Sequence, residues 1–137
     1  MRLSIFAALA LALVVTPAGA EGGAHKRRLV SGQWGGPHVS MTVTESGASV
    51  EYDCAHGTVD RRLKLDVDGR FSALGTHVRE HGGPVRRGEP EDKHPARYTG
   101  EVRDGTMLLT VTLVDTGEAV GQYTLTLGSP GQVFKCK

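Results

Sequence analysis

The stretch TMLLTVTLV, residues 106–114, has an apolar residue at every second position: Met107, Leu109, Val111 and Leu113. Successive side chains of a β-strand point to opposite faces, so this spacing predicts a strand with one buried face and one face in water. The Asp-Gly pair just before it, in RDGT at 103–106, is a strong hairpin signal, because both central residues of a type I′ turn have positive φ. The stretch therefore predicts an antiparallel sheet.

The same alternation recurs along the chain and predicts eight strands and no helix. The expected strands are 38–44, 48–54, 61–67, 70–80, 96–102, 106–114, 121–128 and 132–137. Turn sequences separate many of them: ESGA at 45–48, VDGR at 67–70, RDGT at 103–106 and GSPG at 128–131. Short links indicate an antiparallel meander, which can remove its exposed edges by closing on itself. The predicted fold class is all-β, a small eight-stranded up-and-down barrel, with a β-sandwich as the alternative.

The first twenty residues, MRLSIFAALALALVVTPAGA, have the pattern of a signal peptide. Arg2 precedes an apolar run, and Ala18 and Ala20 form an A-x-A cleavage site. The run is shorter than the roughly 20 residues that a membrane-spanning helix needs. We therefore expect an exported chain, periplasmic or extracellular, without a membrane span after cleavage. The expected organisation is a signal peptide at 1–20, a flexible N-terminal tail at 21–33 and a single all-β domain at 34–137.

The charge balance argues against nucleic acid as a partner. The chain has 16 Lys and Arg residues against 15 Asp and Glu residues, and loss of Arg2 with the signal peptide would make the numbers equal. Nucleic-acid binding depends on clustered basic residues, and the only basic run is HKRR at 25–28. We interpret that run as a short solvated tail.

The two cysteines, Cys54 and Cys136, are expected to form a disulfide, because oxidising compartments favour that bond. A metal ligand and a catalytic thiolate beside His56 are the alternatives. In a meander, alternate turns lie at the same end of the molecule, and this rule places both cysteines at one end. The pairing is therefore geometrically reasonable.

The same end receives the long segment 81–95, whose glycines and prolines exclude regular structure. Loops of this length in compact domains are usually functional or disordered. Arg86 and Arg87 could clamp an anionic group, and a solvated lid is the alternative. The candidate binding residues at this end are Trp34, His38, His56, His81, Arg86, Arg87, His94 and Asp115.

Catalytic and metal signatures are missing from the sequence. Four of the histidines gather at the loop end in the meander, and imidazoles suit zinc or copper, but there is no HExxH, CxxC or GxSxG pattern. An enzyme would require three or more of a set of five side chains to converge on one atom: His38, His56, His81, His94 and Asp115. No catalytic residue, metal ligand or cofactor is predicted.

The sequence resembles two known families, one through a short motif and one over most of the chain. The Gly32-x-Trp34 motif resembles the G-x-W signature of lipocalins and related eight-stranded ligand-binding barrels. Most of the chain, 34–136, resembles a family of small exported bacterial proteins of unknown function, through WGGPHVSMTV, DCAHG, GRFSALG, REHGGPVR and PARYTGEV followed by MLLTVTL. The second resemblance implies export and an all-β fold, and it implies no catalytic residues.

The function predicted from these observations is that of a non-enzymatic binding module that presents the loop end to a small molecule or an envelope protein. The alternatives are a metal-dependent or hydrolytic enzyme, and an envelope structural protein or protease inhibitor. A carrier would have a hollow interior, whereas a filled interior favours recognition at the surface. The residues expected to line the interior are Met41, Tyr52, Leu65, Tyr98, Leu109 and Leu125.

Overall fold

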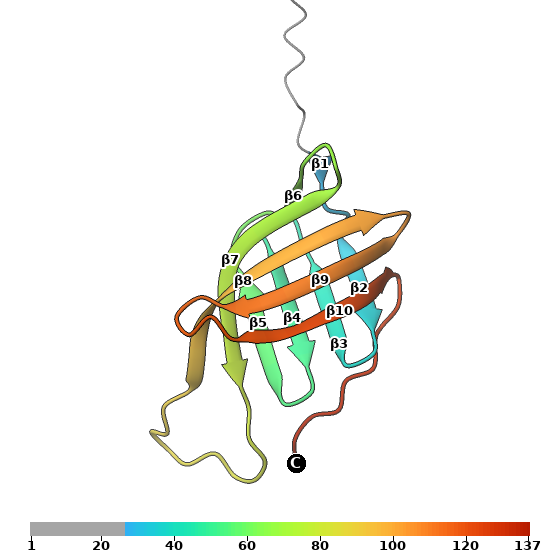
Figure 1. Ribbon diagram of the computed structural model, residues 1–137. Helices are drawn as coiled ribbons and strands as arrows, with labels where there is room; N and C mark the ends of the chain where they lie inside the picture. The colour runs from blue at the N-terminus through green and yellow to red at the C-terminus, as the bar shows by residue number, and fades with distance from the viewer. Residues whose placement is uncertain (1–26) are drawn as a thin grey trace, which may run out of the picture.

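The computed structural model describes residues 27–137 and contains a closed, eight-stranded antiparallel barrel (Figure 1). The barrel strands are β2 (Gly32–Gly36), β3 (Val39–Val43), β4 (Ala48–Tyr52), β5 (Ala55–Val59), β7 (Arg70–Arg79), β8 (Asp92–Arg103), β9 (Thr106–Leu113) and β10 (Ala119–Leu127). Two short strands, β1 (Arg27–Arg28) and β6 (Lys64–Leu65), pair with each other outside the barrel. The described residues contain no helix, so the predicted all-β fold and eight-stranded barrel are confirmed.

The barrel has up-and-down connectivity, in which each strand pairs antiparallel with the preceding barrel strand. The last strand, β10, closes the barrel by pairing with β2, with Thr126 opposite Gly35 and Leu127 opposite Trp34. A sandwich of two separate sheets, the alternative that the sequence allowed, is not the observed architecture.

Two of the eight predicted strands are wrong. The segment 61–67 belongs mainly to the connection between β5 and β7, and 132–137 forms no strand. Their places in the barrel are taken by β2 and β5, which were expected as tail and loop. Both are rich in small residues for a packing reason: a Cβ on Gly36 would collide with the carbonyl of Thr124, and one on Gly57 with the hydroxyl of Tyr98. Alternation of apolar side chains cannot reveal such strands.

The folded part also begins earlier than the predicted boundary at residue 34. Arg27 and Arg28 pair with β6, Leu29 is buried, and β2 starts at Gly32. Residues 27–33 are therefore part of the domain and not a tail. The predicted signal peptide at 1–20 and the remainder of the predicted tail lie outside the described residues.

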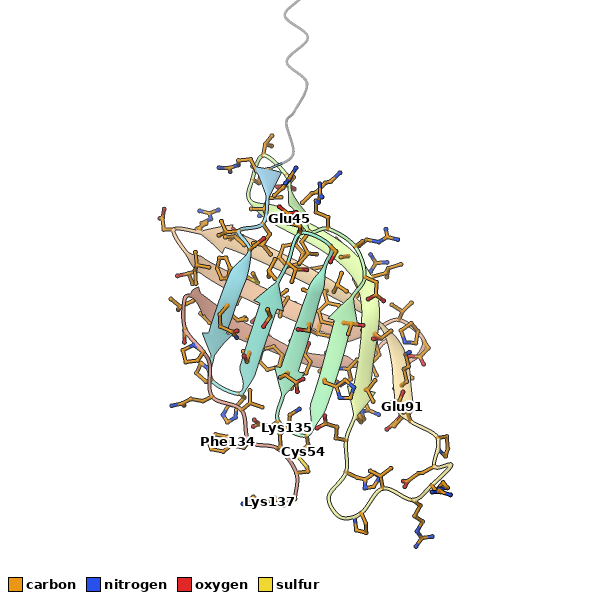
Figure 2. All side chains as sticks on the ribbon, turned by 180° about the vertical axis from the view of Figure 1, so that it is seen from behind. Glu45, Cys54, Glu91, Phe134, Lys135 and Lys137 are labelled. Atoms are coloured by element: carbon orange, nitrogen blue, oxygen red, sulfur yellow. A yellow bond between two sulfur atoms is a disulfide. The ribbon has the colours of Figure 1, made fainter. Side chains whose placement is uncertain are left out.

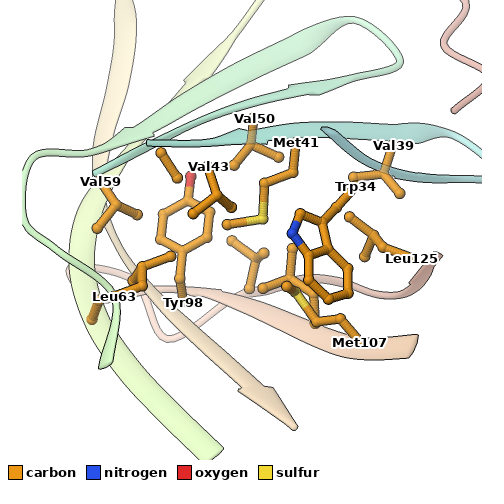
Figure 3. Close-up of a cluster of buried hydrophobic side chains, with 14 of the residues drawn as sticks. Trp34, Val39, Met41, Val43, Val50, Val59, Leu63, Tyr98, Met107 and Leu125 are labelled. Atoms are coloured by element: carbon orange, nitrogen blue, oxygen red, sulfur yellow. The ribbon is translucent and has the colours of Figure 1, made fainter. Parts of the chain in front are cut away.

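The barrel interior is packed with side chains (Figure 3). Trp34, Tyr98, Met41 and Met107 are the largest side chains with almost no exposure, and they fill the space between the strands together with leucines and valines. The Tyr98 hydroxyl donates a 2.6 Å hydrogen bond to the carbonyl of Thr76. All six residues expected to line a hollow are buried in this core. The packed interior therefore differs from the hollow that a carrier would have.

Each end of the barrel has one long connection and several short turns (Figure 1). One end, here called the loop end, has the turns at 37–38, 53–54 and 114–118 and the long β7–β8 loop, residues 80–91. The other end has the turn 44–47, the excursion 60–69 and the turn at Asp104 and Gly105. Both residues of that last turn have positive φ, as the Asp-Gly signal predicted.

Candidate functional site

The C-terminal residues 128–137, here called the strap, run from β10 across the loop end (Figure 1). The strap first follows β2, where the Gln132 amide donates to the carbonyl of Gly36 at 3.0 Å. It then reaches the β4–β5 turn, where the Phe134 amide donates to Oδ1 of Asp53 at 2.7 Å. Figure 2 shows Phe134, Lys135 and Lys137 near Cys54, at the end of the barrel opposite Glu45.

The predicted pairing of the cysteines is confirmed. The sulfur atoms of Cys54 and Cys136 are at bonding distance, with their Cα atoms 4.9 Å apart, and the described residues contain no free cysteine. The bond is possible because the strap is not a strand, so it can cross the rim of the barrel without a place in the sheet.

Lys135, next to the disulfide, is held by groups of the barrel. Its Nζ donates to the carbonyl of Ala55 at 2.8 Å and to both carboxylate oxygens of Glu80 at 3.1 Å, and it lies 2.5 Å from Oε2 of Glu51. Burial opposes the charge of Lys135, but the hydrogen bonds to Glu51 and Glu80 outweigh it and raise the lysine pKa. Burial likewise works against the charge of Glu80, but its bonds to His56 and Lys135 lower the pKa of that carboxyl. The lysine and Glu80 are therefore charged at neutral pH.

A pocket of about 280 Å³, here called the loop pocket, lies between the β7–β8 loop and the ends of β5 and β7. Its walls contain four carboxylates and three apolar side chains. The lining residues are His56, Val78, Arg79, Glu80, His81, Val85, Glu89, Pro90, Glu91 and Asp92. The pocket therefore combines an acidic lining with an apolar surface.

Contacts within the loop hold one wall of this pocket. Nε2 of His81 is 2.8 Å from Oε1 of Glu89, and the Arg86 amide donates to Oε2 of Glu89 at 3.0 Å. The amide of Arg86 and the ring of His81 lower the pKa of Glu89. The pKa of His81 is raised by its bond to the carbonyl of Gly82 and by Glu89. His81 therefore forms an ion pair with Glu89 and with none of the other carboxylates of the pocket.

The remaining charges of the pocket are balanced unevenly. Arg79 donates to Glu118, which lies outside the pocket, at 2.7 Å, and its contact with Asp92 is longer, at 3.9 Å. Among the described residues no ion pair engages Glu91, which is exposed and lies where β8 begins (Figure 2). Asp92 is also 2.8 Å from Nε2 of His94, so Glu91 is the one lining carboxylate that has no charged partner among the described residues.

A wider depression, of about 560 Å³, lies on the outer face of β7, β8 and β9. Its charged groups balance in number, with Lys64 and Arg70 against Asp66 and Glu101, and Arg70 lies 3.7 Å from Glu101. It has no excess charge of either sign, and it lies away from the long loop. The loop pocket is the better candidate site.

The predicted site residues are distributed over several places. His94 and Asp115 do meet, with Nδ1 of His94 2.7 Å from Oδ2 of Asp115, and Asp92 contacts the other ring nitrogen at 2.8 Å. His38 pairs instead with Asp53, His56 with Glu80, and His81 with Glu89. These side chains do not converge on one atom, and in residues 27–137 no three His, Cys, Asp or Glu side chains are placed to hold a metal ion.

Trp34 and the two loop arginines lie outside the loop pocket. Trp34 is buried in the core, where its Nε1 donates to the carbonyl of Val30 at 3.0 Å, so its side chain contributes no surface at the loop end. Arg86 and Arg87 are exposed and line a shallow hollow on the loop itself. They form no clamp with another element.

Sequence reasoning missed the acidic residues of this end. Asp115 is the only carboxylate among the predicted binding residues, and that set does not contain Glu51, Glu80 or Glu91. One signal was available: once Cys136 is paired with Cys54, its neighbour Lys135 must lie beside the β4–β5 turn and its carboxylates.

Comparison with known proteins gives no family model, no curated protein and no solved structure that matches the chain. The resemblances stated from the sequence remain predictions. Within residues 27–137, no helix has the length and apolar character needed to cross a membrane.

Proposed function

We propose that the protein is an exported, non-enzymatic binding module that recognises a positively charged group at the loop pocket. Export is supported by the cysteine pair, since such bonds persist in oxidising compartments. The packed interior is the observation that carries the proposal, because it leaves the surface as the place of recognition.

The chemistry of the pocket supports an ammonium or guanidinium group on a short apolar chain. Glu91 supplies a carboxylate that no ion pair engages among the described residues, and charge-assisted hydrogen bonds to such groups are the strong ones. Val78, Val85 and Pro90 offer apolar contact to the chain that carries the charge. A free polyamine and a lysine side chain of a partner protein share this chemistry.

The test is isothermal titration calorimetry of the oxidised protein with spermidine and, in a second arm, with a lysine-containing peptide. We expect Glu91→Gln to weaken binding by about tenfold, the loss of roughly one charge-assisted hydrogen bond. Glu45→Gln is the matched control, because Glu45 is an exposed glutamate at the opposite end, 3.9 Å from Arg28. Binding of the peptide alone would assign a protein partner, and equal affinities of the two variants would refute the proposal.

A further inference from the structure

The ammonium group of Lys135 lies in a cradle of oxygen atoms. Both carboxylate oxygens of Glu80, one of Glu51 and the carbonyl of Ala55 surround Nζ within 3.1 Å. An ammonium has three N–H donors and no acceptor, so an all-oxygen environment of this kind satisfies it. Here the occupant belongs to the same chain.

The cradle is built by the barrel and not by the strap. Glu51 lies on β4 opposite His56 on β5, Ala55 begins β5, and Glu80 follows β7 directly. His56 also holds Glu80, with Nδ1 2.8 Å from Oε1. If the strap moved away, the cradle would therefore lose the ammonium group of Lys135 and keep its oxygen atoms.

The last residues of the strap have few other attachments. The hydrogen bond from the Phe134 amide to Asp53 and the close approach of the Lys137 carbonyl to Gly82 accompany the bond between Cys136 and Cys54. Cys136 is exposed and Cys54 is partly exposed, so the disulfide joins two residues at the surface of the loop end. The disulfide is the one covalent attachment among these contacts.

We propose that Glu51, Glu80 and the carbonyl of Ala55 form a binding site for a primary ammonium group, which Lys135 fills while the disulfide is closed. A dithiol opens the site: its thiolate attacks one sulfur, and its second thiol resolves the mixed disulfide. The dithiol is oxidised to a disulfide, and Cys54 and Cys136 are reduced to thiols, each gaining a proton. The released strap then exposes the cradle to an external amine.

This site shares Glu80 and His56 with the loop pocket, but the inference does not depend on the proposed function. The loop pocket is accessible in the oxidised protein and uses Glu91, whereas the cradle is filled in the oxidised protein. The two sites can therefore be tested in different states of the chain.

The test is a ¹⁵N–¹H NMR titration with n-butylammonium, which resembles a lysine side chain. In oxidised Lys135→Ala the cradle is empty with the disulfide intact, and we expect saturable shifts at the amides of Ala55 and Glu80. Oxidised wild type and Lys137→Ala, a matched strap variant, should bind there at least about tenfold more weakly, a difference of about 1.4 kcal/mol. Tetramethylammonium, which has the charge but no N–H donor, should not reproduce the shifts.

Two outcomes would overturn the proposal of the site. One is an equal response of Lys135→Ala and Lys137→Ala, and the other is an unchanged response when Glu80→Gln is added to Lys135→Ala. If Lys135→Ala does not fold, wild type reduced with dithiothreitol takes its place in the same titration.

The redox gate has its own readout, the reactivity of Lys135 toward reductive methylation measured by peptide mass spectrometry. We expect dithiothreitol to raise it by about tenfold, equivalent to about 1.4 kcal/mol, with Lys93 as the internal reference. Unchanged reactivity of Lys135 in protein shown to be reduced would refute the gate. Failure of these experiments would leave spermidine binding at Glu91 intact, so the two proposals can fail separately.

Discussion

Cys136 lies with its Cα atom 4.9 Å from that of Cys54, although 82 positions separate the two residues in the sequence. A bond that closes so long a loop restricts the unfolded chain strongly. We predict that replacing both cysteines with serine lowers the free energy of unfolding by about 4 kcal/mol. Urea unfolding of the two proteins under oxidising conditions measures the difference.

Dithiothreitol provides the control for this prediction. It should lower the unfolding midpoint of the wild type and leave that of the double serine variant unchanged. Equal midpoints for oxidised wild type and the variant would contradict a stabilising role for the bond.

The hydrogen bond between the hydroxyl of Tyr98 and the carbonyl of Thr76 lies inside the packed barrel. Tyr98→Phe removes the donor of this part-buried hydrogen bond, so we expect a loss of about 1 kcal/mol in the free energy of unfolding. Tyr123→Phe is the control, because Tyr123 is only partly buried and no hydrogen bond of its hydroxyl is found among the described residues. Chemical denaturation compares the two, and an equal loss in both would count against the bond.

The pair His94 and Asp115 predicts a pH-dependent stability. The bonds to Asp115 and Asp92 raise the pKa of His94 above 6.5, so its contribution is complete below that pH and is lost as the pH rises through the raised value. The bond to His94 lowers the pKa of Asp115 below 3.8, so that contribution is present above this pH and is lost on further acidification. The pair therefore stabilises the fold most between these two pH values.

Asp115→Asn should accordingly lower the melting temperature more at about pH 5.5 than at about pH 9, as the titration ranges of the two groups require. Differential scanning fluorimetry at both pH values measures this. Asp68→Asn, at an exposed turn of the opposite end, should show no such dependence. A difference that grows with rising pH would contradict the predicted direction.

The alternation of apolar residues was sufficient to predict β3, β4 and β7–β10, but by itself it left a closed barrel and a sandwich both open. It failed at β2 and β5, because Gly36 and Gly57 are required by atoms from distant strands, Thr124 and Tyr98, which local pattern does not contain. The end that holds the cysteines and the long loop was nevertheless predicted correctly. The missed strand β2 precedes the first predicted strand, and the false strand 132–137 follows the last barrel strand. Neither error moves a turn between them to the other end of the barrel.

The site was less predictable than the fold. Turn order placed the histidines at or near one end, but it did not tell which way each ring points, and four of them contact separate carboxylates. The position of Lys135 depends on a disulfide between residues far apart in sequence, and that of Glu91 depends on the path of the loop. Neither follows from spacing along the chain.

The central claim is that recognition takes place at the loop pocket on the outside of a filled barrel. A ¹⁵N–¹H NMR titration of the oxidised wild type with spermidine tests it most directly. We predict that the perturbed amides cluster at residues 78–92. Shifts concentrated instead at interior positions such as Met41 and Leu109, or at the turns 44–47 and 104–105, would contradict the claim.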